Sequence, residues 1–245
     1  MFNQPIPPVT KNLLIINGLF FLATYVFAQS GTDLVNVLAA YYPGSANFRP
    51  WQILTHMFMH ADISHIAFNM FALWMFGSTV ETTLGAKKFI ILYFAAGLGA
   101  FALFNLVNFI QIEQLKSALV TAGIDPVSVL ESFKINSSGV SNTTILQAKE
   151  LVNYYTTPMV GASGAIYGVL VAFGVLYPDA KLALLFFPVP VKAKYFIPVL
   201  IAIEFFLGLE NYAWNPVAHF AHIGGAVIGF ILVWGWKKNL RRQWY

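Results

Sequence analysis

The sequence has no cysteine and very little charge. Without cysteine the chain forms no disulfide, no thiolate nucleophile and no cysteine-ligated metal site. Charged residues make up only 10% of the 245 residues and apolar residues 58%, whereas soluble domains carry about 25% charged residues. A soluble domain of this composition would cover its surface with hydrocarbon, so the composition predicts a membrane protein.

Basic residues are few and lie between apolar runs rather than in one patch. The net charge is only +4. This distribution favours control of membrane topology and argues against nucleic-acid binding. The expected surroundings are therefore a lipid bilayer, with no nucleic-acid partner.

Six apolar runs predict six transmembrane helices in a single domain over residues 1–245. The runs cover residues 12–28, 63–80, 89–109, 158–177, 195–209 and 217–236. The predicted fold is an all-α membrane protein, a bundle of six helices. Residues 111–157 are too polar to cross a bilayer, and we expect an extra insert of helical pieces there, between helices three and four. Residues 179–194, with two prolines, are expected to form a turn region.

Six spans place both ends of the chain on one side of the membrane. With the N-terminus inside, ten of the 14 lysines and arginines fall on the cytoplasmic side. The prediction is cytoplasmic termini, with residues 29–62, 111–157 and 210–216 outside. Ser163 and His222 then lie at similar depth, near the outer ends of two inward-running helices.

Two apolar runs share a pattern of small residues that lets membrane helices pack closely. The pairs are Gly164 with Gly168 and Gly225 with Gly229. Each run also carries one side chain able to do chemistry, Ser163 in the first and His222 in the second. A serine and a histidine presented by two close-packed helices suggest a nucleophile and its general base.

An oxyanion hole is predicted near this pair. His65 and Asn69 are four residues apart, so they lie on one helix face, and both can donate hydrogen bonds to a developing oxyanion. The backbone N–H of Ser163 is the third expected donor. Tyr167, one turn after Ser163, is placed to pack on the ring of His222.

No carboxylate is predicted beside His222. The acids within or at the ends of apolar runs are Glu81, Glu204 and Glu210, and Glu81 falls at the inner end. The expected centre is therefore a Ser–His dyad with slow turnover. Glu204 is a functional candidate because it is an intramembrane acid, but it receives no role.

No metal or cofactor is predicted. His56 and His60 have the i,i+4 spacing of two metal ligands, but no glutamate lies between them and no cysteine can complete a site. A structural or oxyanion-supporting role is expected for His60, and a packing or loop-anchoring role for His56. His219, one turn before His222, is interpreted as a hydrogen-bonding residue.

Four short motifs occur in order along the chain. They are H-x-x-x-x-H-x-x-x-N at residues 60–69, G-x-x-x-E-x-x-x-G at 77–85, G-x-S-G at 161–164 and A-H-x-x-G at 221–225. Together they resemble the rhomboid family of intramembrane serine proteases, bacterial type. One departure is Gln52, where some bacterial members carry arginine after a tryptophan.

The resemblance implies a rhomboid bundle that hydrolyses a peptide bond in or near a substrate's transmembrane helix. It implies catalytic roles for Ser163 and His222, oxyanion roles for His65 and Asn69, and a structural role for Glu81. Transmembrane proteins are the expected substrates, and a bacterial inner membrane is the expected location. Substrate identity and oligomeric state are not predicted.

Two alternatives stay open. The first is a non-catalytic rhomboid-like protein that binds transmembrane clients; such proteins usually lack the dyad that this chain retains. The second is a small transporter or channel that uses intramembrane polar residues as a pathway. Against it, the sequence shows no inverted repeat of interrupted helices.

Overall fold

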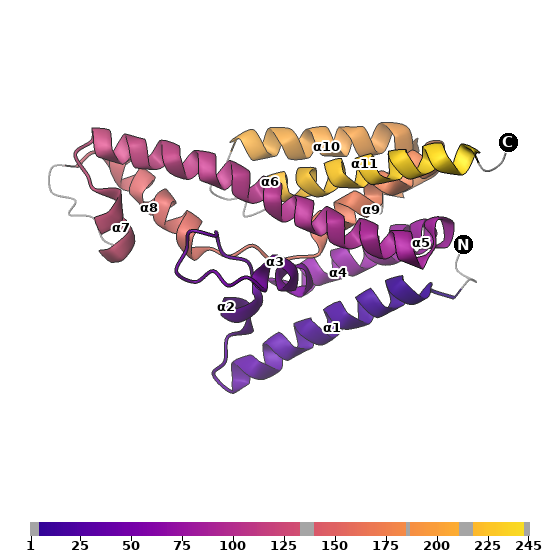
Figure 1. Ribbon diagram of the computed structural model, residues 1–245, viewed down its shortest axis with the longest axis horizontal. Helices are drawn as coiled ribbons and strands as arrows, with labels where there is room; N and C mark the ends of the chain where they lie inside the picture. Colours follow the sequence, from indigo (N-terminus) through magenta and orange to yellow (C-terminus); the bar gives the residue numbers. More distant parts are fainter. Residues whose placement is uncertain (1–4, 133–139, 185–186, 211–217, 243–245) are drawn as a thin grey trace.

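The structure is a computed structural model that describes residues 5–132, 140–184, 187–210 and 218–242. These residues are mostly helical (Figure 1). The helices are α1 (Pro8–Gln29), α2 (Leu34–Leu38), α3 (Gln52–Thr55), α4 (Ile63–Ala72), α5 (Ser78–Leu84), α6 (Ala86–Thr121), α7 (Pro126–Ser132), α8 (Asn142–Thr156), α9 (Ser163–Leu176), α10 (Ala193–Glu210) and α11 (His219–Arg242). A 3₁₀ turn, η1 (His56–Phe58), follows α3, and a π-helical turn, η2 (Leu73–Gly77), joins α4 to α5.

Among the residues that the structure describes, four helical segments are long and apolar enough to cross a membrane. They are α1, the continuous segment Ile63–Leu84, α6, and residues His219–Lys237 of α11. The fourth and fifth predicted spans correspond to α9 and α10. Helix α9 is apolar but has only 14 residues, about 21 Å of helix against a hydrocarbon core of about 30 Å. Helix α10 has 18 residues but carries three charged ones.

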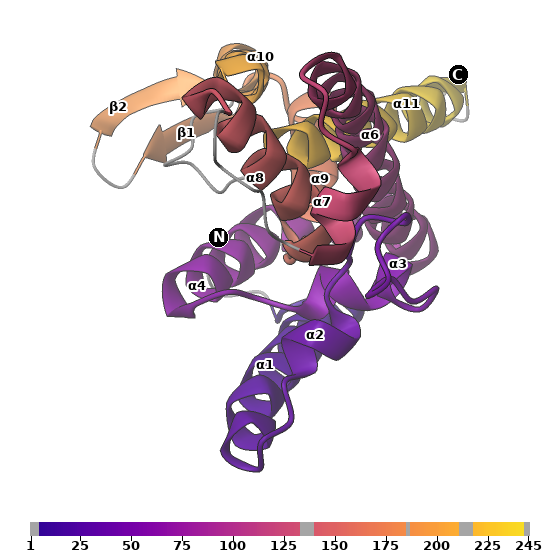
Figure 2. The ribbon, with the colours of Figure 1, turned by 90° about the vertical axis from the view of Figure 1, so that its left-hand side faces the viewer.

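The centre of the bundle is formed by α6, α9 and α11, which lie side by side (Figures 1 and 2). Their backbones touch at glycines. A Cβ added to Gly225 would lie 1.8 Å from the carbonyl oxygen of Gly164, and one added to Gly229 would lie 2.4 Å from that of Gly168. Only glycine fits at such distances, so the small-residue pattern does mark a close helix contact, as predicted.

The first helix is held by a carboxylate from α5. The side chain of Glu81 is buried and accepts hydrogen bonds from the backbone N–H groups of Val9 and Thr10, at 2.9 and 2.7 Å, and from the Thr10 hydroxyl at 2.7 Å. The first N–H groups of a helix have no partner within it, and a negative charge there also complements the helix dipole. Glu81 therefore caps α1, which is a structural role.

The loop between α1 and α4 is anchored by Gln52, the departure from the bacterial pattern. Its buried side-chain oxygen accepts from the backbone N–H of Arg49 at 3.0 Å, and its amide nitrogen lies 3.2 Å from the carbonyl oxygen of Asn47. The neighbouring Trp51 donates its indole N–H to the carbonyl of Val37 at 2.9 Å. A glutamine can therefore tie this loop together without arginine, because it offers both a donor and an acceptor.

The polar insert begins later than predicted. Helix α6 runs without a break to Thr121, so the first expected piece of the insert is the end of the third membrane helix. No proline or glycine interrupts residues 100–121, and low hydropathy ends a membrane span without ending a helix. Helices α7 and α8 fold back onto this extension around a small apolar core. Its buried members are Ile112, Leu119, Val129, Ala148 and Leu151. The intervening residues 133–139 lie outside the described part of the chain.

The all-α prediction misses one element. Strands β1 (Lys181–Leu184) and β2 (Phe187–Lys192) form an antiparallel hairpin between α9 and α10, in the segment expected to be a turn region. Lys181 pairs with Lys192, and Asp179 lies 3.2 Å from the amine of Lys192 and 2.9 Å from that of Lys194. Two prolines do not prevent pairing here, because an edge strand can point the side that lacks N–H groups away from its partner.

Candidate active site

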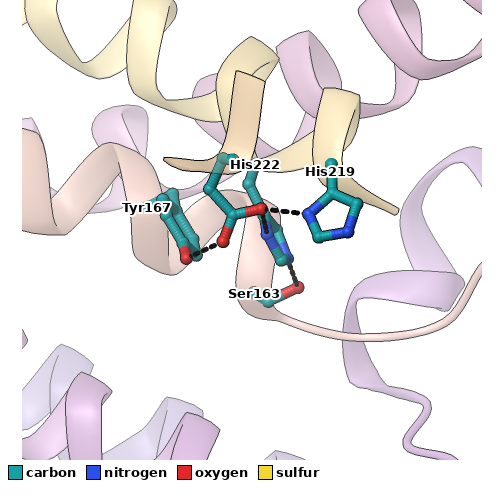
Figure 3. Close-up of polar contacts among 5 residues, drawn as sticks. Ser163, Tyr167, His219 and His222 are labelled. Atoms are coloured by element: carbon teal, nitrogen blue, oxygen red, sulfur yellow. Dashed lines mark hydrogen bonds and ion pairs between the residues drawn. The ribbon is translucent and has the colours of Figure 1, made fainter. Parts of the chain in front are cut away.

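Ser163 and His222 come together at the beginnings of two adjacent helices. Ser163 is the first residue of α9, and His222 lies in the first turn of α11. The hydroxyl oxygen of Ser163 lies 2.9 Å from Nε2 of His222 (Figure 3). The predicted pair is therefore within hydrogen-bond distance. It sits where the glycine contacts hold α9 and α11 together.

The ring of His222 is held on one face by Tyr167. The two rings are stacked with centroids 4.2 Å apart and planes 6° apart. Tyr167 lies one turn after Ser163 on α9, so one helix presents both the hydroxyl and the surface that orients the imidazole. This packing confirms the prediction made from the i,i+4 spacing.

A carboxylate does lie beside His222, so the prediction that none is available was wrong. Oε2 of Glu204 on α10 is 3.0 Å from Nδ1 of His222 and 2.6 Å from Nδ1 of His219, and Tyr167 donates its hydroxyl to the other carboxylate oxygen (Figure 3). A sequence signal was present: on the topology predicted from the sequence, α10 runs outward and Glu204 stands near its outer end, at the depth predicted for Ser163. The missing information was which way the side chain faces.

One predicted oxyanion donor, His65, lies beside the Ser163 hydroxyl. A Cβ on Gly161 would be 2.8 Å from Nε2 of His65 and 3.6 Å from the Ser163 hydroxyl oxygen, so the imidazole and the hydroxyl meet around this glycine. The backbone N–H of Ala61 points to Nδ1 of His65 at 3.4 Å, which makes Nδ1 the acceptor and leaves Nε2 as the donor of a neutral ring. Asn69 is buried, and its amide nitrogen has no hydrogen-bond partner among the described residues.

Gly161 holds a backbone conformation that other residues rarely adopt. Its φ is +122°, and its N–H donates to the carbonyl oxygen of His56 at 3.0 Å. The His56 ring in turn donates from Nδ1 to the carbonyl of Gln52 at 2.8 Å. The segment leading into Ser163 is thus fixed to the loop between α1 and α4. His56 acts as a loop anchor, one of the roles expected for it.

Burial lowers the pKa of two histidines in this loop. The pKa values of His56 and His60 both fall to about 4; burial is the main cause for both, and the nearby His65 contributes to the shift of His60. Both rings are therefore neutral at physiological pH. The His60 ring makes an edge contact with His65, with centroids 5.1 Å apart. That contact restrains the orientation of the His65 ring.

One group of side chains in the described part of the chain has metal-ligand spacing. The ligand atoms of Glu204, His219 and His222 all lie within 4.8 Å of one another. A carboxylate and two imidazoles can bind zinc. Here the same atoms make a hydrogen bond and a close ionic contact with one another, and these contacts account for their positions.

A match to the Rhomboid domain family covers residues 47–124 and 132–239. This is well over half of the chain. The chain belongs to the rhomboid family. The membership agrees with the order of the four motifs and with the helical membrane architecture, and it confirms the family predicted from the sequence.

The individual rhomboid relatives share less than a third of the aligned residues with this chain. The chain is 29% identical over 191 residues to rhomboid protein 1, mitochondrial, of Saccharomyces cerevisiae, which covers 78% of this chain and 43% of the relative. It is 29% identical over 214 residues to an uncharacterised mitochondrial rhomboid protein of Schizosaccharomyces pombe, covering 78% and 53%. It is 26% identical over 204 residues to the human presenilin-associated rhomboid-like protein, mitochondrial, covering 79% and 41%.

The chain thus spans about half the length of these rhomboid relatives. All three carry mitochondrial names, so the comparisons support the family but not the bacterial type that the motifs suggested.

Proposed function

We propose that this rhomboid is an intramembrane serine endopeptidase, with Ser163 as nucleophile and His222 as general base. The observation that carries the proposal is the 2.9 Å distance between the hydroxyl of Ser163 and Nε2 of His222, with the imidazole stacked on Tyr167. A serine hydroxyl is a weak nucleophile until a base accepts its proton, and this geometry provides that base.

The surroundings of Ser163 support stabilisation of an oxyanion. Ser163 begins α9, so its backbone N–H has no acceptor within the helix. His65 supplies a further donor beside Gly161, and Asn69, one turn later on α4, has a buried amide nitrogen without a partner among the described residues. Donors fixed in a water-poor site stabilise the charge that develops on the scissile carbonyl. No cofactor is required by this mechanism.

The proposed substrates are transmembrane segments of other proteins, cut near the outer face of the membrane. The positive-inside count supports cytoplasmic termini. The first turn of α1 and the last turn of α11 lie at the same end of the bundle, in keeping with an even number of spans (Figure 1). The site lies at the beginnings of α9 and α11, which an inward direction would put at the outer side.

The compartment has two candidates. The compact six-helix plan favours a bacterial plasma membrane, and the names of the relatives favour a mitochondrial one. Fractionation of cells that express the tagged chain from its own promoter would assign the membrane.

The direct test is labelling of the detergent-solubilised protein with a fluorophosphonate probe. We expect the wild type to be labelled and both Ser163→Ala and His222→Ala to lose labelling while their melting temperatures stay within a few degrees of wild type. Labelling that persists in Ser163→Ala would refute the assignment of the nucleophile. A folded wild type that is neither labelled nor cleaves a transmembrane substrate would favour the alternative, a non-catalytic client-binding protein.

A further inference from the structure

We propose that Glu204 is a positioning residue that extends the Ser163–His222 pair to a Ser–His–Glu triad. The inference rests on the proposed function. The two ring nitrogens of His222 face different partners: Nε2 lies 2.9 Å from the hydroxyl of Ser163, and Nδ1 lies 3.0 Å from Oε2 of Glu204 (Figure 3). This order of serine, imidazole and carboxylate is the arrangement found in soluble serine hydrolases.

The carboxylate is fixed by partners from two neighbouring helices, α9 and α11. Glu204 on α10 receives the hydroxyl of Tyr167 from α9 at Oε1 and lies 2.6 Å from Nδ1 of His219 on α11 at Oε2. The side chains of Glu204 and His222 are each only 10% exposed. A buried carboxylate with good partners keeps its place, and its field acts through a medium of lower dielectric constant than water.

Tyr167 couples the two groups. Its ring stacks on the imidazole of His222, while its hydroxyl binds the carboxylate of Glu204. One side chain therefore sets both the tilt of the base and the position of the charge beside it. A single Tyr167 rotamer thus restrains both the imidazole and the carboxylate.

The contribution of Glu204 is mainly one of charge. Although Nδ1 of His222 is 3.0 Å from Oε2, this nitrogen has no aligned hydrogen bond among the described residues. An opposite charge at this distance stabilises the imidazolium without requiring an aligned hydrogen bond.

The negative charge of Glu204 matters for the reaction while His222 is protonated. When the hydroxyl oxygen of Ser163 bonds to the scissile carbonyl carbon, its proton moves to Nε2 of His222, and an electron pair moves onto the carbonyl oxygen. The intermediate then collapses, the C–N bond breaks, and the proton on Nε2 passes to the leaving nitrogen. Glu204 stays ionised throughout and stabilises the imidazolium that exists between the two transfers.

The test is the rate of acylation by a fluorophosphonate, measured against pH for wild type and Glu204→Gln. The titratable groups that face His222 are Glu204 on α10, Tyr167 on α9, His219 on α11 and His65 on α4. We expect Glu204→Gln to lower the rate by about 10- to 1000-fold at neutral pH, with the acid limb of the profile displaced to lower pH because the neutral base persists there. In cleavage of a transmembrane substrate, kcat should fall with KM unchanged.

A purely structural glutamate gives a different result. Glu204→Gln would then lower the melting temperature but leave the pH profile of the folded fraction where it is in wild type, and that outcome would overturn the proposal. If Glu204→Gln does not fold, Glu204→Asp replaces it. Aspartate keeps the charge but draws it back from Nδ1, so we expect a smaller loss of rate than with glutamine and a smaller displacement of the acid limb. A rate and profile equal to wild type in Glu204→Asp would refute the proposal.

Ser163→Ala separates this inference from the proposed function. Labelling that survives in Ser163→Ala defeats both. Labelling that is lost in Ser163→Ala but is normal in a folded Glu204→Gln defeats only the role of Glu204 and leaves a dyad.

Discussion

Replacing Gly225 by alanine should slow the proposed reaction of Ser163 about 100-fold without changing a reacting group. A Cβ at residue 225 would lie 1.8 Å from the carbonyl oxygen of Gly164, and real Cβ atoms essentially never approach another atom within 3.0 Å. The backbones of α9 and α11 must therefore separate locally by about 1.2 Å or more. Gly164 follows Ser163 directly, and Gly225 lies one turn after His222. A local separation of α9 and α11 therefore also moves Ser163 away from His222.

The magnitude follows from the distance between the two reacting atoms. At present the Ser163 hydroxyl oxygen and Nε2 of His222 are 2.9 Å apart. Adding the required displacement takes them to roughly 4 Å, beyond hydrogen-bond distance. A misplacement of about 1 Å costs about 100-fold in rate, which corresponds to about 2.7 kcal/mol in the barrier. Overpacking of this contact should also lower stability by about 1–3 kcal/mol.

The assay is fluorophosphonate labelling together with thermal unfolding in the same detergent. Gly235→Ala is the matched control, because it lies on the same helix and a Cβ there meets nothing within 4 Å. We expect the control to label like wild type and to gain up to about 1 kcal/mol from its better helix propensity.

The reasoning would be refuted if Gly225→Ala labelled as fast as Gly235→Ala. The close backbone contact would then not set the distance between the serine and the histidine. A folded Gly225→Ala variant that labels slowly, beside a normal Gly235→Ala, is the expected result.

Two further predictions concern stability. Glu81→Gln should lower the free energy of unfolding by about 2 kcal/mol, because it replaces the charged acceptor of the Val9 and Thr10 N–H groups. Thr10→Val loses only one hydroxyl hydrogen bond and should lower the free energy of unfolding by less. Equal melting temperatures of Glu81→Gln and wild type would contradict the capping role of Glu81. The second concerns pH. The pKa of His56 is about 4 in the folded chain because of burial, against about 6.5 when unfolded, so the unfolded state binds more protons between these values and stability falls as pH falls. The loss from His56 should be about 2 kcal/mol between pH 7 and pH 5, and His60, with a similar pKa, adds to it. Melting in detergent against pH should show a shallower slope for His56→Asn, and an unchanged slope would contradict the buried neutral ring.

The site residues could be predicted because their spacing carries geometry. Tyr167 lies one turn after Ser163, and the small-residue pairs mark where two helices touch. Together, these two facts predict that Ser163 and His222 lie next to each other. The catalytic roles themselves stay predictions until the variants are measured.

The end of α6 was misjudged for a definite reason. Hydropathy measures how well a segment tolerates lipid, and it falls after Phe109, where glutamine, glutamate and lysine appear. Helix propensity does not fall there, because these residues are good helix formers. The helix continues to Thr121 and provides the surface on which α8 packs. A membrane boundary and a helix boundary are different physical events.

The sequence alone determined that this chain is a membrane protein of the rhomboid family, and which serine and histidine lie side by side. Composition, small-residue spacing and motif order are local properties that read directly from the chain. Only the tertiary structure decided that Glu204 stands beside His222. Helix α10 is apolar nearly all round, so its sequence has no polar face to set its rotation about its own axis. Packing against α9 and α11, together with the hydrogen bonds of Tyr167 and His219, turns the glutamate toward the imidazole.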